Sequence, residues 1–368
     1  MLVPFNYLQF QFKFHQNYIK AWKKVIRSCE FTLGPHVEKF EKSFSRFIKA
    51  KHCISTNSGT DALVLALKSI GIKNNDEVIT VCNSFYATAG AIALCGAKPV
   101  FVDCDKRYQI DVNKIEKKIT KKTKAIMPVH WGGASPDMDK IMRIAKKYNL
   151  KVIEDACMGI GAKFKRKSPG TFGHVNAFSM HPLKSLNVIG DGGMVVTNDD
   201  KIASWLRKYR NHGMTDRDHI SIWGDNKRLQ PLQAVVASIE LKKVNSIVSK
   251  RNKNSKILDK LLSKISQVEI PDREKNNKET FALYMAKFKK RDKLKSYLIK
   301  NGIEVKIHYP IPLHLQKAAK YLGYKKGDFP EAENQAKELL TLPVHQYLNR
   351  NQLYFMVNKI KNFYKKKI

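Results

Sequence analysis

The sequence lacks any apolar run near the ~20 residues that a membrane-spanning helix needs. Its first residues, MLVPFNYLQFQFKF, mix apolar with polar side chains and do not have the pattern of a signal peptide. The six cysteines are scattered, and no two of them form a CxxC pair. A metal site and a disulfide framework are therefore not expected. These absences favour a cytoplasmic protein with free thiols that does not span a membrane.

Acidic residues are also scarce, because 32 Asp and Glu stand against 68 Lys and Arg, for a net charge of +36. Such an excess can indicate a protein that binds nucleic acid or an anionic membrane surface, and we expect no membrane partner for the reason given next. The lysines, however, are spread along the whole chain, in segments such as KKITKKTK, AKKYNLK and KFKKRDKLK. We therefore interpret them as solvated charges on helix surfaces and expect no nucleic-acid partner, with nucleic-acid binding kept as the alternative.

The length of 368 residues suggests two domains. Between about residues 50 and 200, stretches with apolar residues at helical spacing alternate with short β-branched runs. Strands that alternate with helices of about 10–15 residues predict an α/β fold with a parallel sheet covered on both faces. The expected helices cover residues 60–70, 87–95 and 137–148, and the expected strands cover 78–81, 99–103, 125–129, 152–155 and 193–197.

The character of the sequence changes after about residue 245. Residues 246–264 are highly charged with a helical pattern, and the polar stretch DREKNNKE beyond them predicts a loop. Strand-like and helical pieces follow to the end of the chain. We therefore predict a large domain over residues 1–245, with an N-terminal helical segment, and a smaller α/β domain over residues 246–368.

The segment Ser58-Gly59-Thr60-Asp61 stands between a strand-like run, HCIST, and an expected helix. A turn at a helix N-terminus presents free backbone N–H groups and the positive end of the helix dipole, which suits a phosphate. The same four residues also make a good helix cap without any ligand. Taken alone, this segment leaves both interpretations open.

Two further groups point to a ligand crevice. Glu154 and Asp155 close a β-branched strand, and side chains at the carboxyl ends of parallel strands line such a crevice. A carboxylate there could hold a protonated ring nitrogen, or it could cap a helix or form a surface ion pair. Lys184 lies in the short loop of FSMHPLKSL, where a lysine is a candidate for Schiff-base formation, although most lysines are solvated charges.

Taken in order along the chain, these motifs resemble the DegT/DnrJ/EryC1/StrS family of sugar aminotransferases. The resemblance covers nearly the whole sequence and runs through VPFNYLQFQF, FTLGPHVEKFEKSF, STNSGTDAL, SFYATAGAI, IEDACMGIGA, FSMHPLKSL, GDGGMVVTND, GDNKRLQPLQAVV and HYPIPLHLQKA. It implies the fold of pyridoxal-phosphate-dependent transferases of fold type I, with a mostly parallel sheet flanked by helices and a smaller C-terminal domain. It also implies pyridoxal 5′-phosphate as the cofactor.

The resemblance assigns roles residue by residue. Lys184 matches the lysine that forms the Schiff base, and Asp155 matches the carboxylate that pairs with the pyridine nitrogen. Phe85 matches the aromatic residue that stacks on the cofactor ring, with core packing as the alternative. Asn226 matches a residue that reaches the cofactor phosphate of the neighbouring subunit, which implies a homodimer with shared sites. The expected ligands of the phosphate are Ser58, Gly59, Thr60 and Ser179.

Some positions depart from the family pattern. The family commonly has Gln or His where this chain has Met158, and Ala where it has Cys157; methionine cannot donate a hydrogen bond to the ring. Trp131, in the segment WGG, stands where His-Leu-Tyr-Gly is commoner, and it either shapes the sugar pocket or packs in the core. The resemblance also implies that His308 and Tyr309 lie near the substrate, with a structural histidine as the alternative.

The implied reaction transfers an amino group from an amino acid, with glutamate as the expected donor, to a nucleotide-linked keto-sugar in the biosynthesis of an amino sugar or surface glycan. The segment HPLK is similar to the subgroup that aminates UDP-linked keto-sugars at C4, but the rest of the chain does not decide this. Dehydratases of the family carry His in place of the lysine, so Lys184 favours transamination. A non-catalytic regulatory or nucleic-acid-binding protein is the alternative from another class.

Overall fold

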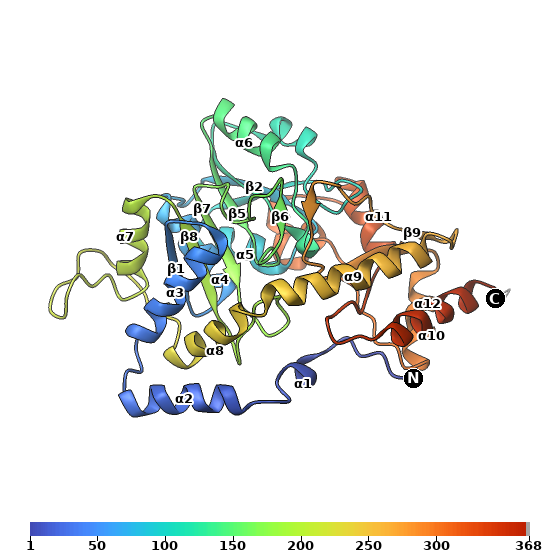
Figure 1. Cartoon of the computed structure of the whole chain (residues 1–368). Helices are drawn as coiled ribbons and strands as arrows, with labels where there is room; N and C mark the ends of the chain where they lie inside the picture. Colours follow the sequence, from blue (N-terminus) through green and yellow to red (C-terminus); the bar gives the residue numbers. More distant parts are fainter. Residues whose placement is uncertain (366–368) are drawn as a thin grey trace.

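The computed structural model describes residues 1–365 and is built around a seven-stranded sheet (Figure 1). The strands lie in the order β1-β8-β7-β5-β4-β2-β3. Within this sheet β8 is antiparallel to both of its neighbours, β1 and β7, and the other pairs are parallel. The mostly parallel sheet expected from the sequence is thus confirmed. The strands are β1 (His52–Thr56), β2 (Glu77–Val81), β3 (Lys98–Val102), β4 (Thr123–Met127), β5 (Lys151–Asp155), β7 (Val175–Ser179) and β8 (Gly193–Thr197).

Helices cover both faces of this sheet, because successive residues of a strand point to opposite sides. Ile54 and Val195 pack with α4, α5 and α7 on one face, whereas Cys53 and Val196 pack with α2, α3 and α8 on the other. The three helices predicted in this region are confirmed as α4, α5 and α6. The helices are α2 (Gln16–Ser28), α3 (Pro35–Ile48), α4 (Gly59–Ser69), α5 (Tyr86–Leu94), α6 (Met138–Lys147), α7 (Asp200–Tyr209) and α8 (Pro231–Leu241).

The C-terminal part forms a second sheet of three strands in the order β12-β11-β9. Helix α9 links the two parts: its Val248 packs in the core beneath the large sheet, and its Leu258 packs in the C-terminal core. Figure 1 shows α9 crossing from one part to the other. The elements are α9 (Val244–Leu262), β9 (Val268–Glu269), β11 (Tyr284–Phe288), α10 (Arg291–Lys300), α11 (Pro330–Glu338), β12 (Leu339–Leu342) and α12 (Arg350–Lys365).

The predicted domain boundary at residue 245 falls in the first turn of α9 and stays a prediction; residues 366–368 of the small domain lie outside the described part. Contacts of the N-terminal residues and of the stretch DREKNNKE cross this boundary. The first residues of the chain join the C-terminal part, because Val3 accepts a hydrogen bond from the backbone N of Glu304 at 3.0 Å and donates one to Gly302 at 2.8 Å. The stretch DREKNNKE contains a two-residue strand, β10 (Asn277–Lys278), which pairs with β6 (Lys163–Phe164) of the large part.

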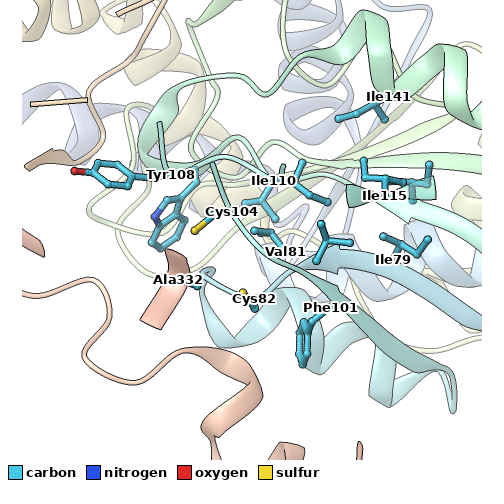
Figure 2. Close-up of a cluster of buried hydrophobic side chains, with 14 of the residues drawn as sticks. Ile79, Val81, Cys82, Phe101, Cys104, Tyr108, Ile110, Ile115, Ile141 and Ala332 are labelled. Atoms are coloured by element: carbon cyan, nitrogen blue, oxygen red, sulfur yellow. The ribbon is translucent and has the colours of Figure 1, made fainter. Parts of the chain in front are cut away.

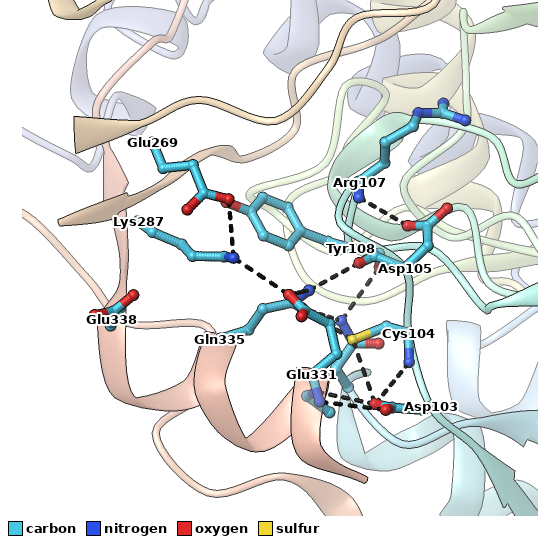
Figure 3. Close-up of polar contacts among 12 residues, drawn as sticks. Asp103, Cys104, Asp105, Arg107, Tyr108, Glu269, Lys287, Glu331, Gln335 and Glu338 are labelled. Atoms are coloured by element: carbon cyan, nitrogen blue, oxygen red, sulfur yellow. Dashed lines mark hydrogen bonds and ion pairs between the residues drawn. The ribbon is translucent and has the colours of Figure 1, made fainter. Parts of the chain in front are cut away.

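Helix α11 is held against the large sheet by an apolar and a polar contact. In the buried cluster of Figure 2, Ala332 of α11 packs in the same core as Cys104. The backbone N of Ala332 donates to Asp103 Oδ1 at 2.9 Å. In the polar cluster of Figure 3, Gln335 Nε2 donates to the Asp105 carbonyl at 2.8 Å. These contacts fix α11 relative to the large sheet.

Short helical turns complete the described part of the chain. None of its helices is long and apolar enough to cross a membrane. The short α1 (Leu8–Gln11) connects the N-terminal strand-like residues with α2. The 3₁₀ turns are η1 (Val112–Lys114), η2 (Glu116–Lys118), η3 (Trp131–Gly133), η4 (Leu313–Leu315) and η5 (Lys317–Leu322).

Candidate active site

A cavity of about 410 Å³ opens at the carboxyl ends of the parallel strands. It is lined by the turns that follow β1, β2, β4, β5 and β7, and by residues of the N-terminal segment, α9 and the C-terminal part. The structure brings together in this cavity eleven of the twelve residues predicted for the site: Ser58, Gly59, Thr60, Phe85, Trp131, Asp155, Met158, Ser179, Lys184, His308 and Tyr309. The exception is Asn226.

The two adjacent acids at the end of β5 have different environments. Glu154 is fully buried and points away from the cavity; it accepts hydrogen bonds from the backbone N of Gly170 at 2.7 Å and Gly173 at 2.8 Å, and its Oε2 lies 2.8 Å from His130 Nε2. Asp155 lines the cavity and is 4% exposed. Strand alternation thus gives Glu154 a structural role and leaves Asp155 as the acid that faces a ligand.

The Asp155 carboxylate is held by two donors. Thr88 Oγ1 donates to Asp155 Oδ2 at 2.7 Å, and the backbone N of Cys157 donates to Oδ1 at 3.2 Å. Ser84 Oγ lies 2.7 Å from Thr88 Oγ1 and extends this chain of polar groups. Sequence reasoning missed Thr88, although the motif SFYATAGAI contains it, because only the tertiary fold brings the first turn of α5 close to the end of β5.

Lys184 lies in a loop that is fixed by hydrogen bonds. Its backbone N donates to the His181 carbonyl at 2.9 Å, its carbonyl accepts from Tyr7 Oη at 3.2 Å, and Asn187 Nδ2 donates to the carbonyl of Pro182. The side chain is half-buried and lines the cavity. Among residues 1–365, no carboxylate lies within ion-pair distance of Lys184 Nζ. The amine therefore faces the cavity without a fixed counter-ion.

The turn after β1 caps helix α4 and also forms part of a possible phosphate site. Ser58 Oγ donates to Asp61 Oδ2 at 2.8 Å and accepts from the Asp61 backbone N at 3.1 Å, so its side chain acts as the helix cap. Gly59 lies directly against Ser179, because a Cβ on Gly59 would stand 2.6 Å from Ser179 Cβ. This contact brings the N-terminus of α4 and the Ser179 hydroxyl to one wall of the cavity, an arrangement that fits a phosphate group.

Replacing Gly59 by alanine is expected to weaken the binding of pyridoxal phosphate, the cofactor that the resemblance implies, about 10-fold, because the new methyl group must push the turn away from Ser179 and lengthen charge-assisted hydrogen bonds. The dissociation constant is measured by titrating apoprotein with the cofactor and following its absorbance. Gly90→Ala is the matched control, since a Cβ at Gly90 would meet nothing within 4 Å. Equal affinities of the two variants would contradict a phosphate site at this turn.

Aromatic side chains form another part of the cavity wall. Phe85, at the N-cap of α5, lines the cavity and remains 45% exposed, which is inconsistent with plain core packing. Tyr309 packs against Phe85, with ring centroids 6.1 Å apart, and against Trp131, at 5.7 Å. Trp131 is 2% exposed and lines the cavity, so it packs in the core and shapes the site at the same time.

Close packing explains why glycines occupy the two positions after Trp131. Gly132 and Gly133 have φ of 67° and 96°, and a Cβ on Gly133 would stand 1.8 Å from Thr280 Oγ1. The backbone N of Thr280 donates to the Gly133 carbonyl at 3.0 Å. The segment WGG thus lets the C-terminal part approach the large sheet beside the cavity.

Met158 and His308 present uncharged groups to the cavity. The thioether of Met158 is at most a weak acceptor, and its backbone carbonyl accepts from Thr280 Oγ1 at 2.8 Å. His308 Nδ1 lies 2.9 Å from Thr341 Oγ1, and burial together with the charge of Lys184 lowers the pKa of His308 to about 4. Burial and the neighbouring Asp155 raise the pKa of the Cys157 thiol, so it stays protonated.

Three further residues that line the cavity come from distant parts of the chain, and sequence reasoning missed them. Phe5 stacks on His308 with ring centroids 6.0 Å apart, and Tyr7 contacts the Lys184 loop. Arg251 lies on α9, in a segment whose many charges predict a solvated face. No local pattern indicates that the N-terminus and α9 meet at this cavity.

Asn226 does not line the cavity of its own chain. It is exposed, and its Oδ1 accepts from Arg228 Nε at 2.9 Å. It lies in the segment between α7 and α8, where Trp223 is 87% exposed. Its predicted contact with a neighbouring subunit therefore stays a prediction.

Comparisons with known proteins agree with this geometry. A sequence model of the DegT/DnrJ/EryC1/StrS aminotransferase family matches residues 13–361. The chain is 40% identical over 350 residues to a protein of Geobacillus stearothermophilus named "Pleiotropic regulatory protein", with 94% of each covered. It is 37% identical over 328 residues to UDP-2-acetamido-2-deoxy-3-oxo-D-glucuronate aminotransferase of Pseudomonas aeruginosa, with 89% of this chain and 90% of that protein covered. The crystal structure of S. venezuelae DesV in complex with a ketimine intermediate is similar with a TM-score of 0.96 and 32% identity, and covers 100% of this chain and 99% of that one.

Proposed function

The chain belongs to the DegT/DnrJ/EryC1/StrS aminotransferase family and is a pyridoxal-phosphate-dependent aminotransferase of fold type I, and from this premise we propose that it transfers an amino group from glutamate to a nucleotide-linked keto-sugar. One observation carries the proposal: Lys184, Asp155 and the contact between Gly59 and Ser179 meet in a single cavity. The UDP-linked sugar in the name of the Pseudomonas relative supports a nucleotide sugar as the acceptor.

The residues of the cavity fit the cofactor. The N-terminus of α4 with Ser179 would hold its phosphate, Asp155 its ring nitrogen, and Phe85 one face of its ring. When bound, pyridoxal phosphate supplies an aldehyde that condenses with amines and a ring that accepts the electron pair left by proton removal.

The protein residues then have distinct roles. Lys184 Nζ removes the proton from Cα of the amino donor and, in the second half of the reaction, delivers a proton to the sugar carbon that receives nitrogen. Asp155 is oriented by Thr88 and the backbone N of Cys157. Its negative charge would stabilise the positive charge on the ring nitrogen of the cofactor. The aromatic side chains of Phe85, Trp131 and Tyr309 pack together and give these groups an apolar neighbourhood.

A regulatory role is the second candidate, because one relative is named a regulatory protein and the chain carries a net charge of +36. The presence of Lys184 opposite a held carboxylate favours catalysis, since a purely binding protein has no use for that amine. The same lysine disfavours the dehydratase alternative. We further propose a cytoplasmic enzyme of amino-sugar or surface-glycan biosynthesis.

The proposed function is tested by absorption spectroscopy of the protein with pyridoxal phosphate. We expect a visible band of the bound cofactor, its loss on addition of glutamate, and its return with a nucleotide-linked keto-sugar but not with the corresponding saturated sugar nucleotide. A band that no amino acid changes would overturn the aminotransferase assignment. A response to glutamate without a response to any keto-sugar nucleotide would overturn only the proposed acceptor.

We also propose that the enzyme is a homodimer in which each subunit completes the site of the other. Two observations support this. Asn226 is exposed and absent from its own chain's cavity, and Ile220 and Trp223 of the same segment are exposed apolar side chains. A second copy of the chain would cover this apolar segment and bring Asn226 to the partner's cofactor phosphate.

Asn226→Ala is expected to weaken binding of pyridoxal phosphate about 10-fold, because one hydrogen bond to a charged group is lost. Mixing subunits decides whether the residue acts across the interface. A heterodimer of Lys184→Ala and Asn226→Ala subunits has one complete site if Asn226 serves the partner, and none if it serves its own chain. Recovery of activity and of tight cofactor binding after subunit exchange is therefore the expected result, and no recovery would contradict the shared site.

A further inference from the structure

A second, smaller cavity adjoins the active site. It has a volume of about 20 Å³, and Ser84, His308 and Tyr309 line both this cavity and the larger one. The rest of its wall comes from Asn83, from α11 and from the segment that follows Tyr309. Among residues 1–365, those that line it include no Asp, Glu, Lys or Arg. One water molecule needs about 10–15 Å³ of such space, so the small cavity suits a single neutral water.

An acceptor on the wall of the small cavity needs a donor. Asn83 Oδ1 is buried, and no group of the described residues 1–365 donates a hydrogen bond to it. The other end of the amide fixes its orientation, because Asn83 Nδ2 donates to the Tyr108 carbonyl at 3.2 Å and to Gln335 Oε1 at 3.0 Å. Exchanging the amide oxygen and nitrogen would place the oxygen against two acceptors. A buried acceptor without a donor is unfavourable, so an occupant that donates would stabilise this site.

The hydroxyl of Ser84 is a second acceptor on the same wall. Thr88 Oγ1 donates its one hydrogen to Asp155 Oδ2 at 2.7 Å, so it must accept from Ser84 Oγ, which also lies at 2.7 Å. Ser84 Oγ therefore uses its own hydrogen on Thr88 and is left with free lone pairs. Ser84 is 3% exposed, and in the part of the chain that the structure describes no other group bonds to its oxygen.

We propose that the small cavity holds one ordered water that donates to Asn83 Oδ1 and to Ser84 Oγ, which makes Asn83 a positioning residue for Asp155. A water has two hydrogens, one for each acceptor. All hydrogens then point from the water through Ser84 and Thr88 toward the acid. Hydrogen bonds that run in one direction polarise and strengthen one another.

The chain of hydrogen bonds has a consequence for the cofactor. Stronger donation to Asp155 favours its ionised form, so the proton shared with the ring nitrogen of bound pyridoxal phosphate stays on the ring. Ring protonation is what lets the cofactor accept the electron pair left by proton removal. The inference rests on the proposed role of Asp155, and it uses neither the identity of the amino donor nor that of the acceptor.

A similar chain that ends on the neighbouring acid supplies the control. Ser135 Oγ lies 3.1 Å from His130 Nδ1, and His130 Nε2 lies 2.8 Å from Glu154 Oε2. Ser135 is 1% exposed, so it is as deeply buried as Ser84. Ser135→Ala therefore removes a buried serine hydroxyl from a chain that does not reach Asp155.

The first test locates the water and measures the state of the ring. A high-resolution crystal structure of the holoenzyme is expected to show one ordered water within hydrogen-bond distance of Asn83 Oδ1 and Ser84 Oγ. The enzyme is also loaded with pyridoxal phosphate that carries an isotope label at the ring nitrogen, and the nitrogen signal is recorded by solid-state NMR. Ser84→Ala and Asn83→Leu should move this signal toward that of the unprotonated ring, and Ser135→Ala should leave it unchanged.

The second test asks whether the variants act through one water. Ser84→Ala is expected to slow proton removal from the amino donor about 3-fold, at the lower end of what a neutral hydrogen bond contributes. Ala336→Val directs additional methyl groups from α11 into the small cavity and should displace the water while both acceptors stay in place. Added to Ser84→Ala, neither Asn83→Leu nor Ala336→Val should slow the reaction further.

Several results would overturn the inference. These are a small cavity without an ordered water, a ring signal that neither Asn83→Leu nor Ala336→Val moves, and an equal shift in Ser135→Ala. If Asn83→Leu does not fold, as thermal unfolding will show, Ala336→Val decides alone. Asp155→Asn separates the two levels of the argument: no shift in that variant would overturn the role of Asp155 together with the inference, whereas a shift in that variant alone would overturn only the water.

Discussion

Replacing Lys184 by alanine is expected to lower turnover by about 10³-fold or more, because the only cavity-lining amine in the described chain is removed. The protein should still bind pyridoxal phosphate, since the phosphate site and Asp155 are unchanged. Turnover is measured with glutamate and a nucleotide-linked keto-sugar. Covalent attachment is measured by borohydride reduction and mass spectrometry, which should label Lys184 in the wild type and no residue in the variant.

Lys163→Ala is the matched control for this variant. Lys163 is also partly buried, and burial and neighbouring lysines lower its pKa, but it donates to Ser168 outside the cavity. Its replacement should leave turnover and labelling unchanged. Turnover of Lys184→Ala close to that of the wild type, or labelling of another lysine, would remove Lys184 from the mechanism and move the regulatory alternative forward.

The fold could be predicted well where the periodicity of apolar residues indicates the type of each element. The alternation of strands and helices between residues 50 and 200 reflects the period of each element, and the structure contains them. Strand β7 was not predicted because VNAFS is buried on both faces and includes two polar residues, so it shows no alternation. The N-terminal pairing of Val3 with Ile303 has no local signal, because the two residues are distant in the sequence.

The sequence predicted those residues of the site that belong to recognisable motifs. The resemblance assigned Asp155 rather than Glu154 to the ring nitrogen, whereas residue type alone does not distinguish the two acids, because they differ in the face of the strand on which they lie. Likewise, Thr88 and Arg251 belong to segments whose local patterns indicate ordinary helices, and their positions at the site arise from packing between distant elements. The roles of residues within one motif could therefore be predicted from the sequence, whereas the roles of residues that reach the site through tertiary contacts could not.

Asp155→Asn is expected to lower the rates of both half-reactions by about 10³-fold, because the isosteric amide keeps the shape but removes the negative charge that stabilises positive charge on the ring nitrogen. Thr88→Val should have a smaller effect, about 10-fold, since it removes one donor to Asp155 Oδ2 and leaves the charge in place. Stopped-flow absorbance measures each half-reaction, and titration measures cofactor affinity, which should change little in Asp155→Asn.

Glu154→Gln distinguishes chemistry from strand stability. Glu154 accepts from backbone N–H groups at Gly170, Phe172 and Gly173, so its replacement should destabilise the fold by about 3 kcal/mol through lost charge-assisted hydrogen bonds. The folded fraction should nevertheless retain nearly normal half-reaction rates. If Glu154→Gln slowed proton removal as much as Asp155→Asn does, the division of labour between the adjacent acids would be wrong, and Asp155 would act only by supporting the end of β5.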